Sequence, residues 1–310
     1  MKVATSLADT DVSHSSVVSI GNFDGLHLGH RRILRIVVDR AHQLGALAVA
    51  MTFSPHPTHF FAPDRAPRLI STLEQKINLM SDTGIDVLFI ASFDYAFSRL
   101  SPEHFVREYL FEGLKARAVC VGGNFNFGYR QRGTVQTLRE FPNLEVIEVL
   151  PVRVRGTIVS SSRIRELTAA GEVSAACRLL GRWMQIEGDV VPGAGRGRTI
   201  VVPTINLQPK NELIPKTGVY VARISLDGGA FLNAVTNIGF RPTFGETNLT
   251  IETFVLDAPV PAQSAKANLE FLYRLRDERK FESPEELRRQ IALDVQRAQK
   301  FFRLLAKRKR

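Results

Sequence analysis

The sequence predicts an α/β domain built on a parallel sheet, followed by a small antiparallel barrel or sandwich with a C-terminal helix. A length of 310 residues suits about two hydrophobic cores. In the first half, strand-like runs alternate with helical spacing, which is typical of a parallel sheet. After about residue 182, short alternating runs are separated by Gly, Pro and Asn, which favours antiparallel strands. We therefore expect domains at 1–182 and 183–310.

The first half contains five strand-like runs, most of them continuously apolar as in a buried sheet. The expected strands are 17–20, 47–53, 86–91, 118–121 and 144–150. Between the first two, apolar residues recur at helical spacing over 29–44, and Gly45 is the expected C-cap of this helix.

Three more helices are expected in the first half. Thr72-Leu-Glu-Gln75 is a capping-box pattern that opens a helix to Met80. Ser101-Pro102 places a cap residue before a first-turn proline. The last helical stretch covers 172–180, just before the sequence pattern changes.

The second half contains short alternating runs and then one long helical stripe. The expected strands are 184–191, 219–224, 233–237, 250–256 and 269–275. Ser283-Pro-Glu-Glu286 is a capping box with proline at the first helical position. The helix that follows has an apolar stripe formed by Leu287, Ile291, Val295, Ala298, Phe302 and Leu305.

Composition excludes several classes of protein. A hydrophobic content of 44% with 23% charged residues argues against extensive disorder. The only cysteines, Cys120 and Cys177, have no metal-ligand spacing, which excludes a zinc cluster and a disulfide scaffold. No apolar run approaches the ~20 residues of a spanning helix, and the N-terminus lacks the apolar core of a secretion signal. We expect a cytoplasmic protein without a membrane partner.

The formal net charge of +10 is concentrated at the C-terminal end of the chain. Residues 299–310 carry six basic residues and no acid. A solvated helix end, where cations complement the helix dipole, is the favoured interpretation. Non-specific contact with RNA or anionic lipid is the alternative. We expect no specific nucleic-acid partner.

The strongest local motif is Gly21-Asn-Phe-Asp-Gly-Leu-His-Leu-Gly-His30, which lies between an expected strand and an expected helix. Its glycines allow close approach of a ligand to the backbone. His27 and His30 are three residues apart, so both rings project from the first turn of the helix, where anions are favoured. The pattern indicates a phosphate site; two ordinary surface histidines are the alternative.

A second glycine-rich and basic segment covers 191–207 and precedes a strand-like run. No GxxxxGK[ST] motif occurs in the chain, so this segment is not a Walker A loop. Taken alone, its Gly-Arg-Gly-Arg sequence is also compatible with a flexible nucleic-acid-binding patch.

Several motifs together resemble one family, the bacterial bifunctional riboflavin kinase/FAD synthetases of the His-x-Gly-His nucleotidyltransferase superfamily. In the first half these motifs are GNFDGLHLGH, TFSPHP at 52–57, FSRLSP at 97–102, VGGNFNFG at 121–128 and SSSRIR at 160–165. In the second half they are PTINL at 203–207, PKTGVY at 215–220, NIGFRPTFG at 237–245, TIETFVLD at 250–257 and RKFES at 279–283. The motifs occur in family order over nearly the whole chain. One departure is Gly123, where the family often carries an acidic residue.

The resemblance implies a Rossmann-like nucleotidyltransferase domain at 1–182 that joins FMN to the adenylyl group of ATP. It implies that His27 and His30 hold the ATP phosphates and that Ser161, Ser162 and Arg165 bind the triphosphate and the leaving pyrophosphate. The phosphate loop would consist of Gly21, Asn22, Phe23, Asp24 and Gly25. The flavin would lie near Asn124, Phe125 and Phe127.

For 183–310 the resemblance implies an antiparallel β-barrel that phosphorylates riboflavin. Gly197 and Arg198 would contact ATP, and Thr204 and Asn206 would hold Mg²⁺ through hard oxygen ligands. Glu252 would act as the base for the ribityl hydroxyl, with an ion-paired strand glutamate as the alternative interpretation. Arg279 and Phe281 would lie near the flavin ring.

The expected function is therefore conversion of riboflavin and ATP to FMN and ADP, and of FMN and ATP to FAD and pyrophosphate. Mg²⁺ is the expected cofactor and ATP the co-substrate. One alternative is a His-x-Gly-His nucleotidyltransferase for another phosphate substrate, with a flavin-sensing barrel. The other is a basic nucleic-acid-binding protein.

Overall fold

The computed structural model describes residues 1–192, 204–243, 246–256 and 264–307. Contacts divide the chain into two compact units, Met1–Ser161 and Ser162–Arg310. The second unit includes most of helix α7 (Ser161–Ala169) and all of α8 (Val173–Leu180), because α8 packs against strands of that unit. The expected boundary between 182 and 183 follows the change in sequence pattern and stays a prediction about which residues serve each activity.

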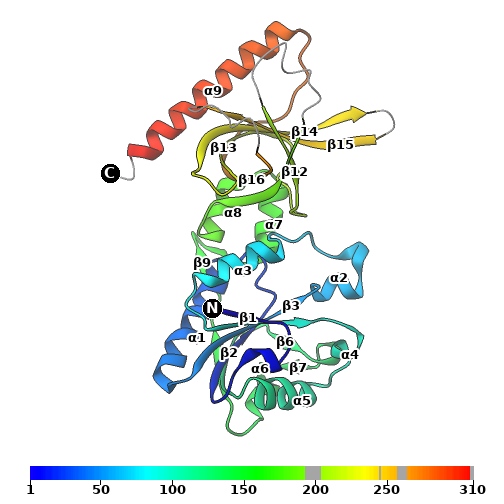
Figure 1. The fold of residues 1–310 in the computed structure, drawn as a ribbon, viewed down its shortest axis with the longest axis vertical. Coiled ribbons are helices and arrows are strands. Elements are labelled where there is room, and N and C mark those ends of the chain that lie inside the picture. The colour runs from blue at the N-terminus through cyan, green and yellow to red at the C-terminus, as the bar shows by residue number, and fades with distance from the viewer. Residues whose placement is uncertain (193–203, 244–245, 257–263, 308–310) are drawn as a thin grey trace. The chain divides into compact units, whose positions relative to one another are not determined.

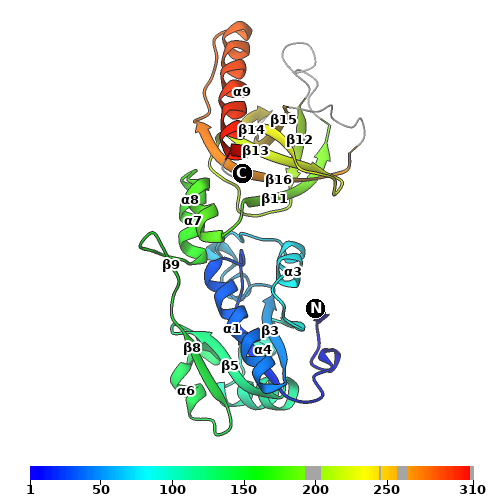
Figure 2. The same ribbon diagram turned by 90° about the vertical axis from the view of Figure 1, so that its left-hand side faces the viewer.

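The first unit contains the expected parallel sheet (Figures 1 and 2). Its six strands lie in the order β1-β4-β3-β2-β5-β8, and every pairing is parallel. The sequence predicts five of these strands and misses β1, which has only three residues. The bounds are β1 Lys2–Ala4, β2 Ser16–Ile20, β3 Leu47–Ser54, β4 Val87–Ser92, β5 Ala116–Gly122 and β8 Glu145–Val149.

The chain order of these strands creates a switch point in the sheet. From β2 the chain moves outward through β3 and β4, and it then returns to pair β5 with the other edge of β2. Ligands of open α/β sheets bind beyond the carboxyl ends of the strands at such a point. The motif at 21–30 follows β2 directly, so the topology places it at this position.

Helices cover both faces of this sheet. Helix α1 (Leu28–Leu44) packs against β2, β3 and β5, and it ends at Gly45 in the left-handed region with φ 57°. Helix α3 (Leu73–Ser81) has the expected capping box between Thr72 and Gln75. Helix α5 (Pro102–Phe105) continues into a π-helix, η3 (Val106–Gly113). Its Val106 and Leu110 pack in a hydrophobic core separate from the core that contains α1.

Short elements complete the first unit. The helical turns are η1 Ala8–Thr10, α2 Pro57–Phe61, η2 Pro63–Arg65, α4 Tyr95–Ser98, η4 Tyr129–Gln131 and α6 Val135–Arg139. Two small antiparallel ribbons join β6 Asn126–Phe127 to β7 Gly133–Thr134, and β9 Arg153–Val154 to β10 Thr157–Ile158.

The second unit is a closed antiparallel barrel, which confirms the β-barrel implied by the family resemblance. The strand order is β11-β12-β15-β14-β13-β16 around the ring. Tyr220 and Phe271 meet edge to face inside it, with ring centroids 5.3 Å apart. The bounds are β11 Met184–Val191, β12 Ile205–Pro209, β13 Gly218–Leu226, β14 Leu232–Thr243, β15 Glu246–Val255 and β16 Lys266–Arg276.

Helix α9 (Pro284–Lys307) lies against β13 and β14 of the barrel. Ser283 Oγ accepts a hydrogen bond from the Glu286 backbone N–H at 3.2 Å, as its capping pattern predicts. Of the expected apolar stripe, Ala298 is fully buried and the other members are half-buried. A buried polar contact adds to the stripe, because Asp294 pairs with Arg276 of β16 at 2.8 Å.

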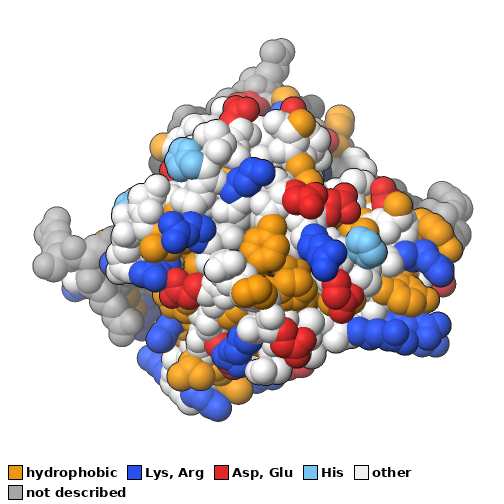
Figure 3. Space-filling model, turned by 90° about the horizontal axis from the view of Figure 1, so that it is seen from below, with side chains coloured by type: hydrophobic (Ala, Val, Ile, Leu, Met, Phe, Trp, Pro, Cys, Tyr) orange, Lys and Arg blue, Asp and Glu red, His pale blue; other side chains and the backbone are white. Residues whose placement is uncertain are grey.

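Figure 3 shows how charged side chains are distributed on one face of the molecule. On the face seen in Figure 3, Lys and Arg side chains alternate with Asp and Glu around a small hydrophobic group. Among the described residues, no helix is long and apolar enough to cross a membrane.

Candidate functional sites

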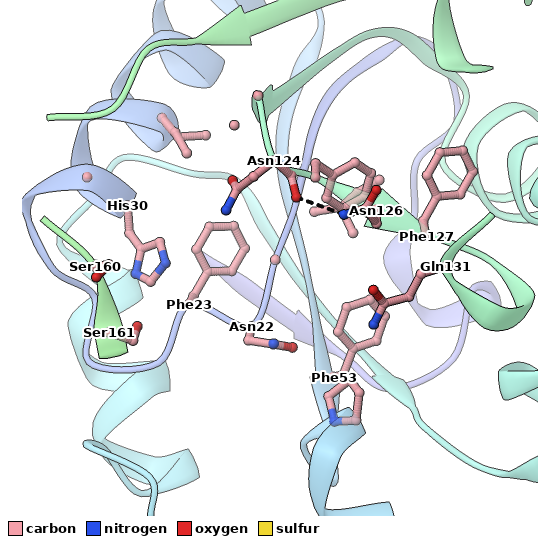
Figure 4. Close-up of a pocket in the computed structure, with 18 of the residues that line it drawn as sticks. Asn22, Phe23, His30, Phe53, Asn124, Asn126, Phe127, Gln131, Ser160 and Ser161 are labelled. Carbon is pink, nitrogen blue, oxygen red and sulfur yellow. Dashed lines mark hydrogen bonds between the residues drawn. The ribbon is translucent and has the colours of Figure 1, made fainter. Parts of the chain in front are cut away.

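A cavity of about 1380 Å³ opens in the first unit at the switch point of the sheet. Its wall is formed by the segments that follow β2, β3, β5 and β8. Figure 4 shows two ends: Phe23, His30, Ser160 and Ser161 lie at one, and Phe53, Phe127 and Gln131 lie at the other. Sheet topology thus places a histidine-and-hydroxyl end opposite an aromatic-and-amide end.

His27 and His30 form one stacked pair at the first turn of α1. Their ring centroids are 3.6 Å apart and the planes differ by 12°. The Nδ1 atom of His27 accepts a hydrogen bond from the His30 backbone N–H at 3.2 Å and so caps the helix. A ring that accepts at Nδ1 carries its proton on Nε2 when neutral, which makes that atom a hydrogen-bond donor.

The surroundings of His30 alter the chemistry of its ring. Burial, followed by the neighbouring His27 and Lys76, holds the pKa of His30 well below its ordinary value. Its Nδ1 is buried and has no hydrogen-bond partner among the described residues. A neutral imidazole with an unsatisfied ring nitrogen at a helix N-terminus is suited to receive a polar ligand there.

The loop between β2 and α1 is strained and held by buried bonds. Phe23 (φ 47°) and Leu26 (φ 36°) adopt left-handed backbone conformations that cost about 1–3 kcal/mol each. The Asp24 carboxylate, only 2% exposed, accepts hydrogen bonds from the backbone N–H groups of Ile70 and Ser71 at 3.0–3.2 Å. Asp24 therefore fixes the shape of the loop and does not line the cavity.

Replacing Asp24 is expected to loosen this loop. Asp24→Ala leaves two buried N–H donors without their carboxylate acceptor, which costs about 1–3 kcal/mol of unfolding free energy. Urea unfolding should therefore show a lower midpoint for this variant. Asp82→Ala removes an exposed aspartate that follows α3 and serves as the matched control. Equal midpoints for both variants would contradict the assigned contacts.

The far end of the cavity is aromatic. Phe125 and Phe127 stack with centroids 5.5 Å apart, and both line the cavity together with Asn124; that this wall binds flavin stays a prediction. Phe61 and Phe93 also line it, and their ring centroids are 5.6 Å apart. Phe61 is 64% exposed although it is a large aromatic side chain. Sequence reasoning missed these two residues because single phenylalanines carry no pattern.

Gly123, which departs from the family pattern, has an acidic neighbour. A Cβ at this position would lie 2.6 Å from the Glu148 carboxylate oxygen. Glu148 comes from β8, lines the same cavity and pairs with Arg139 at 2.8 Å. The glycine therefore leaves room for an acidic side chain that another strand supplies.

Of the remaining residues expected at this site, some line the cavity and others do not. Gly21 and Asn22 line the cavity, whereas Gly25 (φ 77°) only turns the loop. Ser161 also lines it, and its hydroxyl donates to the Asp24 carbonyl oxygen at 3.0 Å. Ser162 and Arg165 belong to the second compact unit, so their predicted phosphate contacts stay predictions.

In the second unit, three polar residues lie side by side on neighbouring strands. Glu252 of β15 is paired in register with Asn206 of β12 on one side and with Asn237 of β14 on the other. Directly paired residues project from the same face of a sheet. Their chain neighbours Ile205 and Ile251 are buried in the barrel, so the three polar side chains project from its outer face.

The oxygen donors here fit the chemistry of magnesium. Thr204 is exposed and immediately precedes β12, where Asn206 lies one residue after the first strand position. The described residues contain no group of three or more His, Cys, Asp or Glu that could enclose a metal ion. A hydroxyl and an amide oxygen suit Mg²⁺, which keeps several waters and is commonly completed by substrate phosphates.

The segment between β16 and α9 approaches the same part of the barrel. A Cβ at Gly239 of β14 would collide with the Glu278 carboxylate, so this segment lies close to the Asn237 position. Within it, the Arg279 guanidinium lies 4.5 Å from the Phe281 ring centroid and pairs with Glu286 at 3.2 Å. Gly197 and Arg198 lie outside the described residues, so their predicted ATP contacts stay predictions.

Comparisons with known proteins match both halves of the chain. The FAD synthetase family model matches residues 9–163, and the riboflavin kinase family model matches residues 180–302. A bifunctional riboflavin kinase/FMN adenylyltransferase of Bacillus subtilis is 36% identical over 301 aligned positions, and the match covers 94% of each chain. The protein of the same name from Escherichia coli (strain K12) is 31% identical over 291 residues, 93% of each chain.

A solved structure shares the fold over nearly the whole length. It is described as a macrolide-efflux protein from Streptococcus pneumoniae, has a TM-score of 0.87 and is 28% identical. The match covers 96% of this chain and 98% of that one. The efflux activity in the name is a statement about that protein, and what this chain shares with it is the architecture.

Proposed function

The chain belongs to the family of bifunctional riboflavin kinase/FMN adenylyltransferases, and on this premise we propose how its residues divide the two reactions. The FAD synthetase part is N-terminal and the flavokinase part is C-terminal. The first joins FMN to the adenylyl group of ATP, and the second phosphorylates riboflavin. Residues 1–182 serve the first reaction in this proposal and residues 183–310 serve the second.

The cavity of the first unit is the observation that carries the adenylylation proposal. Its volume of about 1380 Å³ exceeds the ~300–1000 Å³ typical of a site for one drug-sized ligand, so there is room for two substrates. Its histidine end is suited to ATP phosphates and its aromatic end to an isoalloxazine ring.

Catalysis in the first unit rests on positioning and charge stabilisation. An FMN phosphate oxygen attacks the α-phosphorus of ATP and pyrophosphate leaves on the opposite side, so no covalent nucleophile on the protein is needed. The Nε2–H of His27 and the ring of His30 donate hydrogen bonds to phosphate oxygens as charge develops. Ser161, Ser162 and Arg165 bind the triphosphate in this proposal.

In the second unit, Glu252 is the proposed base. Its carboxylate takes the proton from the ribityl hydroxyl as the hydroxyl oxygen attacks the γ-phosphorus of ATP, and ADP leaves. Thr204 and Asn206 hold Mg²⁺, which neutralises phosphate charge when bound. Arg279 and Phe281 form one side of the flavin position. Because ATP is the co-substrate of both reactions, we place them in the cytoplasm.

Separate feeding of the two flavins tests the proposal. With ATP and Mg²⁺, the purified protein should convert riboflavin to FMN and then to FAD, and supplied FMN to FAD, as measured by chromatography. Omission of Mg²⁺ should stop riboflavin phosphorylation. Binding of flavin without formation of either product would instead favour a nucleotidyltransferase for another substrate with a flavin-sensing barrel.

A further inference from the structure

Lys76 is a buried lysine beside the adenylylation site that the sequence motifs do not include. It lies on α3 and is only 7% exposed, whereas lysines are almost never buried unless they have a partner. Burial lowers the pKa of Lys76, and the negative charge of Asp24 offsets part of that effect. Burial of a charged ammonium group carries a desolvation penalty. The contacts of Lys76 with the 21–25 loop therefore bear on its function.

Two contacts connect Lys76 to the loop. Its Nζ donates to the Thr52 hydroxyl at 3.4 Å, and that hydroxyl donates to the Asn22 carbonyl oxygen at 3.2 Å. Asn22 is the residue from which the chain enters the strained loop, and Asp24 is the acid that holds the other side of it. Lys76 is thus connected to the Asn22 end of the segment by hydrogen bonds, and its charge interacts with Asp24 at the other end.

Lys76 also acts on the histidine pair through its charge. The groups that lower the pKa of His30, besides burial, are His27 and Lys76. The positive charge of Lys76 adds to the effect of burial in disfavouring a charged His30, and it adds positive potential where phosphate charge develops.

We propose that Lys76 is a positioning residue for FMN adenylylation, which supports the 21–25 loop through its hydrogen bond to Thr52 and provides a buried positive charge beside the loop. The proposal rests on the proposed phosphate role of His30. Lys76 makes no contact with substrate in this role and acts through the loop and the imidazole.

Two substitutions separate the loop from the charge. Lys76→Met removes both, whereas Thr52→Val removes the hydroxyl link and leaves the ammonium charge in place. We expect Lys76→Met to lower kcat/KM for FMN adenylylation by about 10–100-fold, which is the range known for residues that orient the ligands of a metal site. Riboflavin phosphorylation should keep its rate. Lys115→Met changes an exposed lysine of the same unit and is the matched control.

The pKa of His30, followed by NMR titration of its ring protons, gives the readout that a purely structural role would not move. It should rise in Lys76→Met, because the neighbouring ammonium charge is removed, and it should stay unchanged in Thr52→Val. A Lys76→Met enzyme with the adenylylation rate and the His30 pKa of the Lys115→Met control would overturn the proposal.

Two further outcomes are decisive. If Lys76→Met does not fold, Thr52→Val tests the link to the loop: slower adenylylation in this folded variant supports that link, and a normal rate overturns it. His30→Ala separates this inference from its premise. Full activity of His30→Ala would refute the proposed role of the histidine, whereas an inactive His30→Ala beside a normal Lys76→Met would refute only the role of Lys76.

Discussion

His30→Ala is expected to stop the reaction sequence at FMN. The variant loses one of two stacked imidazoles and a buried ring nitrogen without a partner among the described residues, at the end of the cavity where we propose that phosphate binds. Loss of one donor that stabilises developing oxyanion charge costs about 10²–10³ in rate. Fed with riboflavin, ATP and Mg²⁺, the variant should accumulate FMN while FAD formation falls by that factor, as measured by chromatography over time.

The control for this variant is His14→Ala, which removes an exposed histidine of the same unit. It should form FAD at the normal rate. A His30→Ala enzyme that also loses riboflavin phosphorylation while its unfolding midpoint is unchanged would show that one site serves both steps. That outcome would refute the assignment of the two reactions to two separate sites.

Glu252→Gln is expected to give the opposite phenotype. An amide cannot accept the ribityl proton, and a positioned general base contributes about 10²–10⁴ in rate. Glutamine keeps the length and the hydrogen-bonding capacity of the side chain between Asn206 and Asn237, so the barrel should remain folded. The rate of riboflavin phosphorylation should fall by about that factor, whereas supplied FMN is still converted to FAD.

Glu285→Gln, an exposed glutamate in the first turn of α9, is the matched control for this substitution. Its rate of riboflavin phosphorylation should equal that of the unmodified enzyme. A normal rate of riboflavin phosphorylation in Glu252→Gln would refute Glu252 as the base. It would instead support the alternative, in which Glu252 is an ion-paired strand residue.

The architecture was predictable because it depends on periodicity and capping. Apolar strand runs and the caps at Thr72, Gly45 and Ser283 each depend on a few neighbouring residues, and the structure confirms them. The short strand β1 was missed because three residues carry too little pattern. The π-helix after Phe105 was also outside prediction, since only the structure reveals how that turn is widened.

The sites were predictable only where residues are close in sequence. His27 and His30 share one helix turn, and their pairing follows from the spacing. Lys76, Phe61 and Glu148 approach the cavity or its loop from separate elements, which no local pattern reveals. The motif places Asp24 in the predicted phosphate loop, but only the structure reveals the partners of its carboxylate, the backbone N–H groups at positions 70 and 71.

The central claim is that two separate sites on one chain carry the two reactions, and mixing the two defective variants tests it most directly. His30→Ala supplies FMN that it cannot adenylylate, and Glu252→Gln adenylylates FMN that it cannot make. Equimolar His30→Ala and Glu252→Gln, given riboflavin, ATP and Mg²⁺, should therefore form FAD although neither variant does so alone. A mixture that forms no more FAD than the separate variants, with both proteins folded, would contradict the assignment of the two sites.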